Sequence, residues 1–146
     1  MPQWAGVVSL SEGRTPLIDA PRTGEWIGGV RLAAKHQGNN PTGSFKDLGM
    51  AACITQAARV GSRITACAST GNTSASMAAY AARAGMKALL FVPYRQISAA
   101  KLAQAIDFGA LVVEVGDTFD EAFKLLREIA SEINLYLVNS LNPFRI

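Results

Sequence analysis

The sequence has few of the features that mark membrane, secreted or nucleic-acid-binding proteins. Only 17% of its 146 residues are charged, the net charge is +3, and the basic residues are scattered. No basic run indicates a nucleic-acid or membrane partner. No apolar stretch approaches the roughly 20 residues that cross a bilayer, and the N-terminus lacks the pattern of a secretory signal. We therefore expect a cytoplasmic protein.

Cysteine and histidine are also scarce. Cys53 and Cys67 do not have the spacing of a metal or redox site, and both lie among apolar residues, so we expect two buried free thiols. His36 is the single histidine, and its place beside a Gly-rich turn indicates a polar loop residue. The sequence predicts no metal site.

The chain has the length and composition of one ordinary globular domain, with 49% hydrophobic residues. Residues 1–45 are rich in Gly, Pro and polar residues and show only short strand-like runs, at 26–27 and 30–34. From residue 46 onward, helical and strand-like segments alternate. We expect an N-terminal segment at 1–60 and a small α/β domain at 61–146.

The alternating region predicts four helices and four strands. The helices are expected near 46–60, 72–84, 98–108 and 119–133. The strands are expected at 64–68, 88–92, 111–115 and 136–138, as short apolar runs typical of parallel strands covered on both faces. Thr118 and Glu121 form a capping box at the start of the last helix.

Gly61, Gly85 and Gly109 recur every 24 residues, each between a helix and a strand. This is the position where a helix ends in a left-handed residue, and Asn134 lies near the next such position. The period indicates βα units, which predict a four-stranded parallel sheet with helices on both faces. The expected strand order is 3-2-1-4, so a crevice opens between the first and fourth strands at their C-terminal ends.

Two polar segments lie at the predicted crevice. Residues 69–74 join the first strand to a helix and suit an anion site at a helix N-terminus, or an ordinary Ser/Thr N-cap. Asn139, Ser140 and Arg145 follow the fourth strand and suit an oxyanion, or a solvated turn. The sequence leaves both pairs of alternatives open.

A third polar segment, residues 40–47, surrounds a lysine. Ser44 and Asp47 have the spacing of a capping box, so Lys46 falls in the first turn of a helix. The positive end of the helix dipole opposes a charge there and favours a neutral, nucleophilic amine. The alternative is a solvated surface lysine.

Three segments closely resemble motifs of the threonine synthases, enzymes of the tryptophan-synthase-β-like class that use pyridoxal 5′-phosphate. They are residues 35–47 around the lysine, 68–76 and 137–146. The first alone also admits threonine dehydratases, which usually read Ser-Ala-Gly-Asn-His where this chain has Ser-Thr-Gly-Asn-Thr. Gln37 and Leu48 depart from the family pattern, as does the turn after the second strand.

The resemblance implies roles for ten residues. Those that hold pyridoxal 5′-phosphate are Lys46, which also moves protons, Phe45, which packs beside it, and Asn72, which contacts the pyridoxal 3-oxygen. Those that hold the substrate carboxylate are Ser69, Thr70, Gly71 and Thr73. Those that hold the substrate phosphate are Asn139, Ser140 and Arg145.

The resemblance further implies the conversion of O-phospho-L-homoserine and water to L-threonine and phosphate, by a two-domain enzyme that is a homodimer when full length. Residues 1–60 belong to its larger domain. The family's C-terminal half and its cofactor-phosphate loop are missing here, so we expect a fragment or truncated form. Such a chain should be inactive, bind the cofactor weakly, and pack loosely over its first 45 residues. A threonine or serine dehydratase-like lyase and an inert α/β domain are the alternatives.

Overall fold

A four-stranded parallel sheet forms the centre of the protein. The computed structural model describes residues 6–94 and 99–145. The strands are β3 (Ile64–Ala68), β4 (Lys87–Val92), β5 (Leu111–Glu114) and β6 (Tyr136–Leu137). Their order is β5-β4-β3-β6, and every neighbouring pair is parallel. In the order of the sequence prediction these are the third, second, first and fourth strands.

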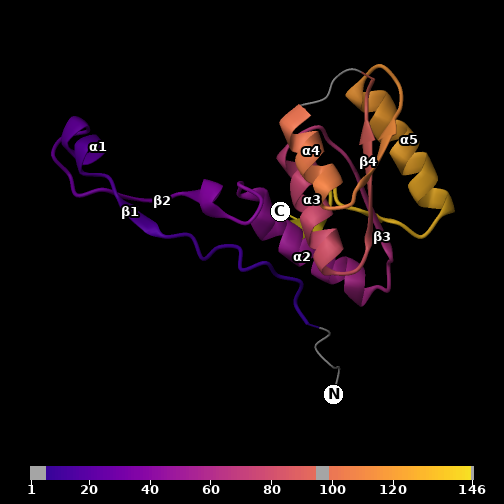
Figure 1. The fold of residues 1–146 in the computed structure, drawn as a ribbon, viewed down its shortest axis with the longest axis horizontal. Coiled ribbons are helices and arrows are strands. Elements are labelled where there is room, and N and C mark those ends of the chain that lie inside the picture. Colours follow the sequence, from indigo (N-terminus) through magenta and orange to yellow (C-terminus); the bar gives the residue numbers. More distant parts are fainter. Residues whose placement is uncertain (1–5, 95–98, 146) are drawn as a thin grey trace.

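Helices cover both faces of this sheet (Figure 1). On one face lie α2 (Lys46–Arg59), α3 (Asn72–Arg83) and α4 (Ala99–Asp107), and on the other lies α5 (Phe119–Glu132). All four predicted helices are confirmed, although the expected start of the third, residue 98, lies outside the described residues. The predicted capping box is present in α5, where Thr118 accepts from the backbone of Glu121 and Glu121 accepts from the backbone of Thr118.

Three helices end at the recurring glycines in the left-handed conformation, and the last helix, α5, does not. Gly61, Gly85 and Gly109 have φ angles of 74°, 67° and 84°, in the left-handed region where glycine has no Cβ to clash. Asn134 does not take this conformation, so that prediction is wrong. Ile133 already leaves the helix in an extended conformation, with φ −122° and ψ 151°, and no left-handed residue is needed.

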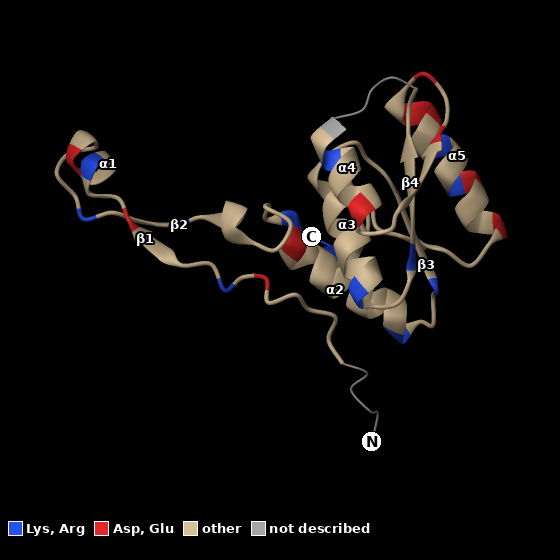
Figure 2. Cartoon of the chain, in the orientation of Figure 1, with Lys and Arg blue, Asp and Glu red and all other residues tan. Residues whose placement is uncertain are grey.

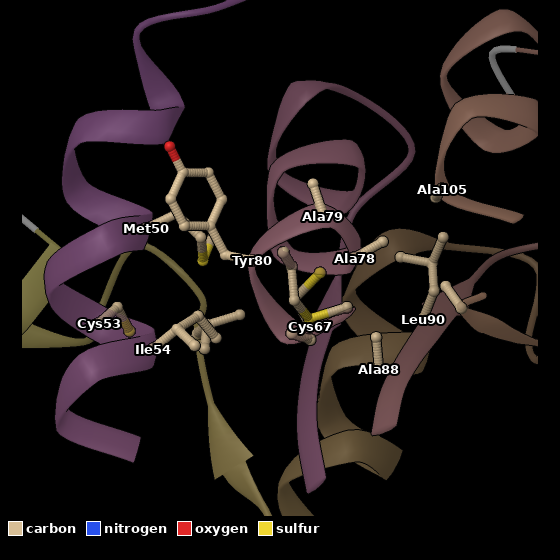
Figure 3. Close-up of a cluster of buried hydrophobic side chains, with 14 of the residues drawn as sticks. Met50, Cys53, Ile54, Cys67, Ala78, Ala79, Tyr80, Ala88, Leu90 and Ala105 are labelled. Atoms are coloured by element: carbon tan, nitrogen blue, oxygen red, sulfur yellow. The ribbon is translucent and has the colours of Figure 1, made fainter. Parts of the chain in front are cut away.

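The main core lies between α2, α3 and the sheet (Figure 3). Tyr80 and Met77 of α3 are fully buried in it. Cys53 and Cys67 are buried free thiols, which confirms that prediction. Burial raises the pKa of each thiol to about 12, against a smaller lowering effect of the Arg145 charge.

Residues 17–35 project away from this body (Figure 1). They contain the antiparallel strands β1 (Leu17–Asp19) and β2 (Ala33–Lys35), with the short helix α1 (Pro21–Trp26) between them. The strand expected at 26–27 is wrong, because Pro21 begins a helix, for which its fixed φ is suited. The run at 30–34 is correct only where it overlaps β2. Trp26 is 85% exposed, the most exposed large apolar residue described.

Residues 8–13, in contrast, are fixed to the body by side chains of α2, α3 and the loop that precedes α2. The backbone N–H of Val8 donates to Thr55 at 3.0 Å, and that of Gly13 donates to Asn40 at 2.9 Å. The Tyr80 hydroxyl donates to Glu12 at 2.7 Å. We predicted loose packing for the first 45 residues. For residues 8–13 that prediction is wrong, because their polar groups are bonded to partners in the body.

Glu12 makes the stability of this attachment depend on pH. Burial acts to raise its pKa, but hydrogen bonds from Tyr80, Leu10 and Ser9 prevail and hold the pKa below its ordinary value of 4.5. A carboxyl with a lowered folded pKa stabilises the fold above its unfolded pKa and loses that contribution as the pH falls. The free energy of unfolding should therefore fall more steeply below about pH 5 in the wild type than in Glu12→Gln.

Urea unfolding followed by circular dichroism at a series of pH values measures this difference. Glu132→Gln, at the exposed end of α5, is the matched control and should follow the wild-type curve. Parallel pH profiles for the wild type and Glu12→Gln would contradict the role of Glu12.

Figure 2 shows both basic and acidic residues on the body, and α5 carries both signs along its length. Within residues 6–94 and 99–145, none of the helices combines the length and the apolar character that crossing a membrane requires.

Candidate functional site

A cleft of about 670 Å³ lies between the start of α2 and the 3₁₀ helix η2 (Pro143–Arg145). This volume falls within the range of small-molecule sites. Its lining residues are Phe45, Lys46, Leu48, Gly49, Ala52, Ser140, Phe144 and Arg145. Among the residues predicted for the site, the cleft thus brings together Phe45, Lys46, Ser140 and Arg145.

Lys46 is the first residue of α2, as the sequence predicted. Its side chain is half-buried, and its Nζ lies 4.4 Å from the centre of the Phe45 ring. Its backbone N–H donates to the Ser44 hydroxyl at 3.2 Å. A primary amine therefore stands at the positive end of a helix, beside an aromatic ring and at the wall of a cleft.

The capping box predicted for Ser44 and Asp47 is wrong. The helix begins one residue later than the box requires, with Phe45 at the N-cap. The Asp47 carboxylate turns to nearer donors and accepts from the backbone N–H of Thr42 at 2.8 Å and from its hydroxyl at 2.5 Å. It also accepts from the Ser76 hydroxyl at 2.6 Å. Asp47 thus joins the loop before Lys46 to α3.

The segment 69–74 connects β3 to the N-terminus of α3. Gly71 is the N-cap, and no side chain caps this helix, so the alternative of an ordinary Ser/Thr N-cap is not observed. The Ser69 hydroxyl instead accepts from the backbone N–H of Gly71 at 3.2 Å. Thr70 is half-buried, and Asn72 is exposed in the first turn.

The two polar segments at the sheet edge lie side by side, as predicted. Asn139 pairs its side-chain amide with the backbone of Ala68, accepting at 3.2 Å and donating at 3.0 Å. Arg145 donates to the carbonyl of Val138 at 2.8 Å and to the hydroxyl of Thr73 at 2.7 Å. The Asn139 amide and the Thr73 hydroxyl are therefore already hydrogen-bonded to groups of this chain, to Ala68 and Arg145 respectively.

Arg145 places a guanidinium in the wall of the cleft. Burial lowers the pKa of its guanidinium, while the nearby Cys67 and Cys53 act in the opposite direction. An arginine stays charged despite such a shift. Because the guanidinium has five N–H donors and the two bonds above occupy two of them, Arg145 can also bind an anion in the cleft.

The predicted site is only partly assembled around this cleft. Six of its residues do not line it: Ser69, Thr70, Gly71, Asn72, Thr73 and Asn139. Sequence reasoning missed the apolar wall, including Gly49 and Phe144, and the partners of Asp47. One signal was available for Gly49, because a glycine inside a helical pattern often marks a close approach.

Comparison with known proteins identifies the class to which the chain belongs. Residues 8–146 match the family described as pyridoxal-phosphate dependent enzyme. A threonine synthase of a Bacillus species is 51% identical over 139 residues, which cover 95% of this chain and 39% of that protein. The Methanocaldococcus jannaschii threonine synthase is 46% identical over 140 residues, which cover 96% of this chain and 35% of that protein. The resemblance to threonine synthases is thus confirmed, and the chain spans less than half of these relatives.

Solved structures agree with this assignment. The threonine deaminase isoform 2 of Solanum lycopersicum has a TM-score of 0.76 and 25% identity, over 85% of this chain and 34% of that one. A pyridoxal 5′-phosphate-dependent aspartate racemase has a TM-score of 0.78 at 23% identity, over 90% of this chain and 41% of that one, and shows the fold alone. The family match over nearly the whole chain and the lysine-bearing cleft lead to one conclusion: this chain belongs to the pyridoxal-phosphate dependent enzyme family.

Proposed function

We propose that this chain carries the lysine half of a threonine synthase site, which converts O-phospho-L-homoserine and water to L-threonine and phosphate. The observation that carries the proposal is the cleft that holds Lys46 and Arg145 together. A primary amine suits the cofactor, and an arginine suits a phosphorylated substrate. The 51% identity to a threonine synthase supports this choice among the reactions of the family.

The residues of the cleft fit pyridoxal 5′-phosphate, an aromatic aldehyde that carries a phosphate. Lys46 offers an amine at the cleft wall, and Phe45 offers a ring beside that amine. The cleft has the size of a cofactor site. When bound, the cofactor supplies an electron sink, and the protein supplies binding, orientation and proton transfer.

The proposed roles follow from these positions. Lys46 holds the cofactor and moves protons at its Nζ, and Phe45 packs beside the ring. Asn72, exposed at the start of α3, contacts the pyridoxal 3-oxygen. The residues proposed for the substrate carboxylate are Ser69, Thr70, Gly71 and Thr73. Those proposed for the substrate phosphate are Asn139, Ser140 and Arg145.

The three residues proposed for the substrate phosphate differ in what they contact. Arg145 and Ser140 line the cleft and can touch the substrate directly. Asn139 has its amide engaged by Ala68, so we propose that it holds the loop in place.

We also propose that a protein of the relatives' full length completes the site. Its remaining part would supply the loop for the cofactor phosphate and would form the larger domain with residues 1–60, leaving 61–146 as the small domain. The exposed apolar residues of the projecting segment, such as Leu17 and Trp26, would then be covered. We propose a cytoplasmic homodimer for that protein.

A chimera tests the proposed reaction. Residues 1–146 are joined to the remaining part of the 51% identical Bacillus protein, so that this chain supplies Lys46 and Arg145. The chimera should release phosphate and threonine from O-phospho-L-homoserine, and should prefer this substrate to threonine as a reactant by about 100-fold or more in kcat/KM. Coupled phosphate release and 2-oxobutanoate formation measure the two reactions.

The controls are the unaltered Bacillus protein and the 146-residue chain alone, which should be inactive. The threonine deaminase among the similar structures motivates the competing substrate. Preferential deamination of threonine would favour the dehydratase-like alternative. A folded, cofactor-loaded chimera without either activity would contradict the proposal.

A further inference from the structure

Asp47 is a carboxylate in the interior, next to the lysine of the cleft. Its side chain is completely buried, and its three hydrogen-bond donors are neutral groups of Thr42 and Ser76. A buried charge is costly unless its environment compensates for it. Here the compensation comes from the loop before Lys46 and from α3, so the charge binds these two elements to each other.

Thr42 is held from several sides. Its backbone N–H and hydroxyl donate to Asp47, and its carbonyl accepts from Gln104 of α4 at 3.3 Å. Lys101 of α4 lies at 3.5 Å from the same carbonyl. Thr42 is 2% exposed, and the chain then turns at Gly43, with φ 81°. The loop that leads to Lys46 is therefore anchored by its polar groups.

The other end of the contact lies on the helix that carries the second site segment. Ser76 is fully buried and lies one turn after Asn72, the first residue of α3. Asp47 directly follows Lys46 in α2. A single carboxylate thus connects α2, which carries the amine, to α3, which begins with Asn72 and Thr73 directly after residues 69–71.

We propose that Asp47 is a positioning residue, which fixes the Lys46 amine relative to the loop 69–73 through its bonds to Thr42 and Ser76. This inference rests on the proposed function for its consequence in catalysis. The fixing of the Lys46 amine can be measured on this chain alone, because Asp47, Thr42 and Ser76 all belong to it and bond to one another. Asp47 acts through Lys46 and needs no contact with the cofactor or the substrate.

Two substitutions remove single bonds of this cluster and keep the shape. Ser76→Ala removes the link to α3, and alanine favours the helix. Thr42→Val removes the hydroxyl bond, whereas Thr42→Ser retains the hydroxyl and is the matched control. Loss of one such bond should make the loop open about 3–10-fold more often, and Lys46 should react correspondingly faster with an acylating reagent.

The first measurement uses the 146-residue chain without cofactor. Acetic anhydride at limiting concentration labels the lysines, and mass spectrometry compares Lys46 with the exposed Lys87 and Lys124. Ser76→Ala and Thr42→Val should accelerate labelling of Lys46 only, Thr42→Ser should match the wild type, and circular dichroism should be unchanged. Equal Lys46 rates in all four folded chains would overturn the proposal.

The second measurement uses the chimera. Ser76→Ala should lower kcat about 10–100-fold while KM and cofactor affinity stay near the wild type, because a small displacement of a reacting group affects the chemical step. A rise in KM with unchanged kcat would overturn the positioning role. The labelling result does not depend on threonine synthesis, so failure of the proposed reaction and failure of the positioning role are distinguishable.

Discussion

Borohydride reduction of the cofactor-loaded chimera is expected to fix the cofactor on Lys46, and Lys46→Ala is expected to abolish this product. Lys46 stands at the wall of the cleft and at the positive end of α2, so its amine is placed to meet a cofactor that enters the cleft. Loss of the amine should lower threonine formation by at least about 10²–10⁴-fold. Peptide mapping by mass spectrometry identifies the modified lysine.

Two other lysines provide controls. Lys35 donates to the carbonyl of Thr15 at 2.7 Å, and Lys101 donates to Gln104 at 3.1 Å, so their amines are engaged elsewhere. Lys35→Ala and Lys101→Ala should retain the product on Lys46. Trapping at Lys35 or Lys101 in the chimera would contradict the assignment of the amine.

The same experiment on the 146-residue chain should give little product. A bond between an aldehyde and an amine is reversible in water, and its persistence requires that the ring and the phosphate are also held. In the cleft, Lys46 can bond to the aldehyde and Phe45 can pack against the ring. We propose that the loop for the cofactor phosphate lies in the part found only in the longer relatives. Tight, stoichiometric binding by the 146-residue chain would show that this part is unnecessary for cofactor binding.

Gly49→Ala is expected to destabilise the protein by about 1–2 kcal/mol, opposite in sign to the usual effect of this change in a helix. Glycine to alanine in a helix interior normally stabilises by about 1 kcal/mol. At Gly49, however, a Cβ would overlap the backbone carbonyl oxygen of Arg145. Because that atom belongs to the backbone of η2, α2 and η2 would have to move apart, and the cleft between them would change.

Urea unfolding of the 146-residue chain measures this effect. A pair of chains shortened to residue 142 is the matched control, since they lack η2 and the overlap with it. In the shortened chain Gly49→Ala should stabilise by about 1 kcal/mol, as helix propensity predicts. Stabilisation in both backgrounds would contradict the close approach of α2 and η2.

Local chemistry explains why the architecture could be predicted from the sequence. The glycines at 61, 85 and 109 end helices because their left-handed conformation depends on the residue itself. The apolar run at 64–68 indicates a strand covered on both faces, and β3 is largely buried. The run at 111–115 indicates a strand as well, but β5 lies at the edge of the sheet and is only partly covered. Given these units, the right-handed crossover rule restricts the strand order, and the observed order β5-β4-β3-β6 agrees with it.

The N-terminal region was harder to predict because its order depends on distant partners. Residues 8–13 have no strong local pattern, yet Thr55 and Tyr80 fix them to the body. The sequence separations of these pairs are 47 and 68 residues, so a local pattern carries no information about them. The strand expected at 26–27 failed for a local reason, since Pro21 begins a helix five residues earlier.

The sequence by itself determined the kind of chemistry: an amine in the first turn of a helix, and polar segments at the C-terminal ends of two adjacent strands. Those features depend on residue type and on the order of elements along the chain. Only the tertiary structure decided which groups meet. In the structure Asp47 does not cap the helix but is buried and bonded to Thr42 and Ser76. The Asn139 side chain is bonded to the backbone of Ala68. A polar side chain bonds to the nearest donors and acceptors in space, and these can come from distant segments, as Ser76 does for Asp47 and Ala68 does for Asn139.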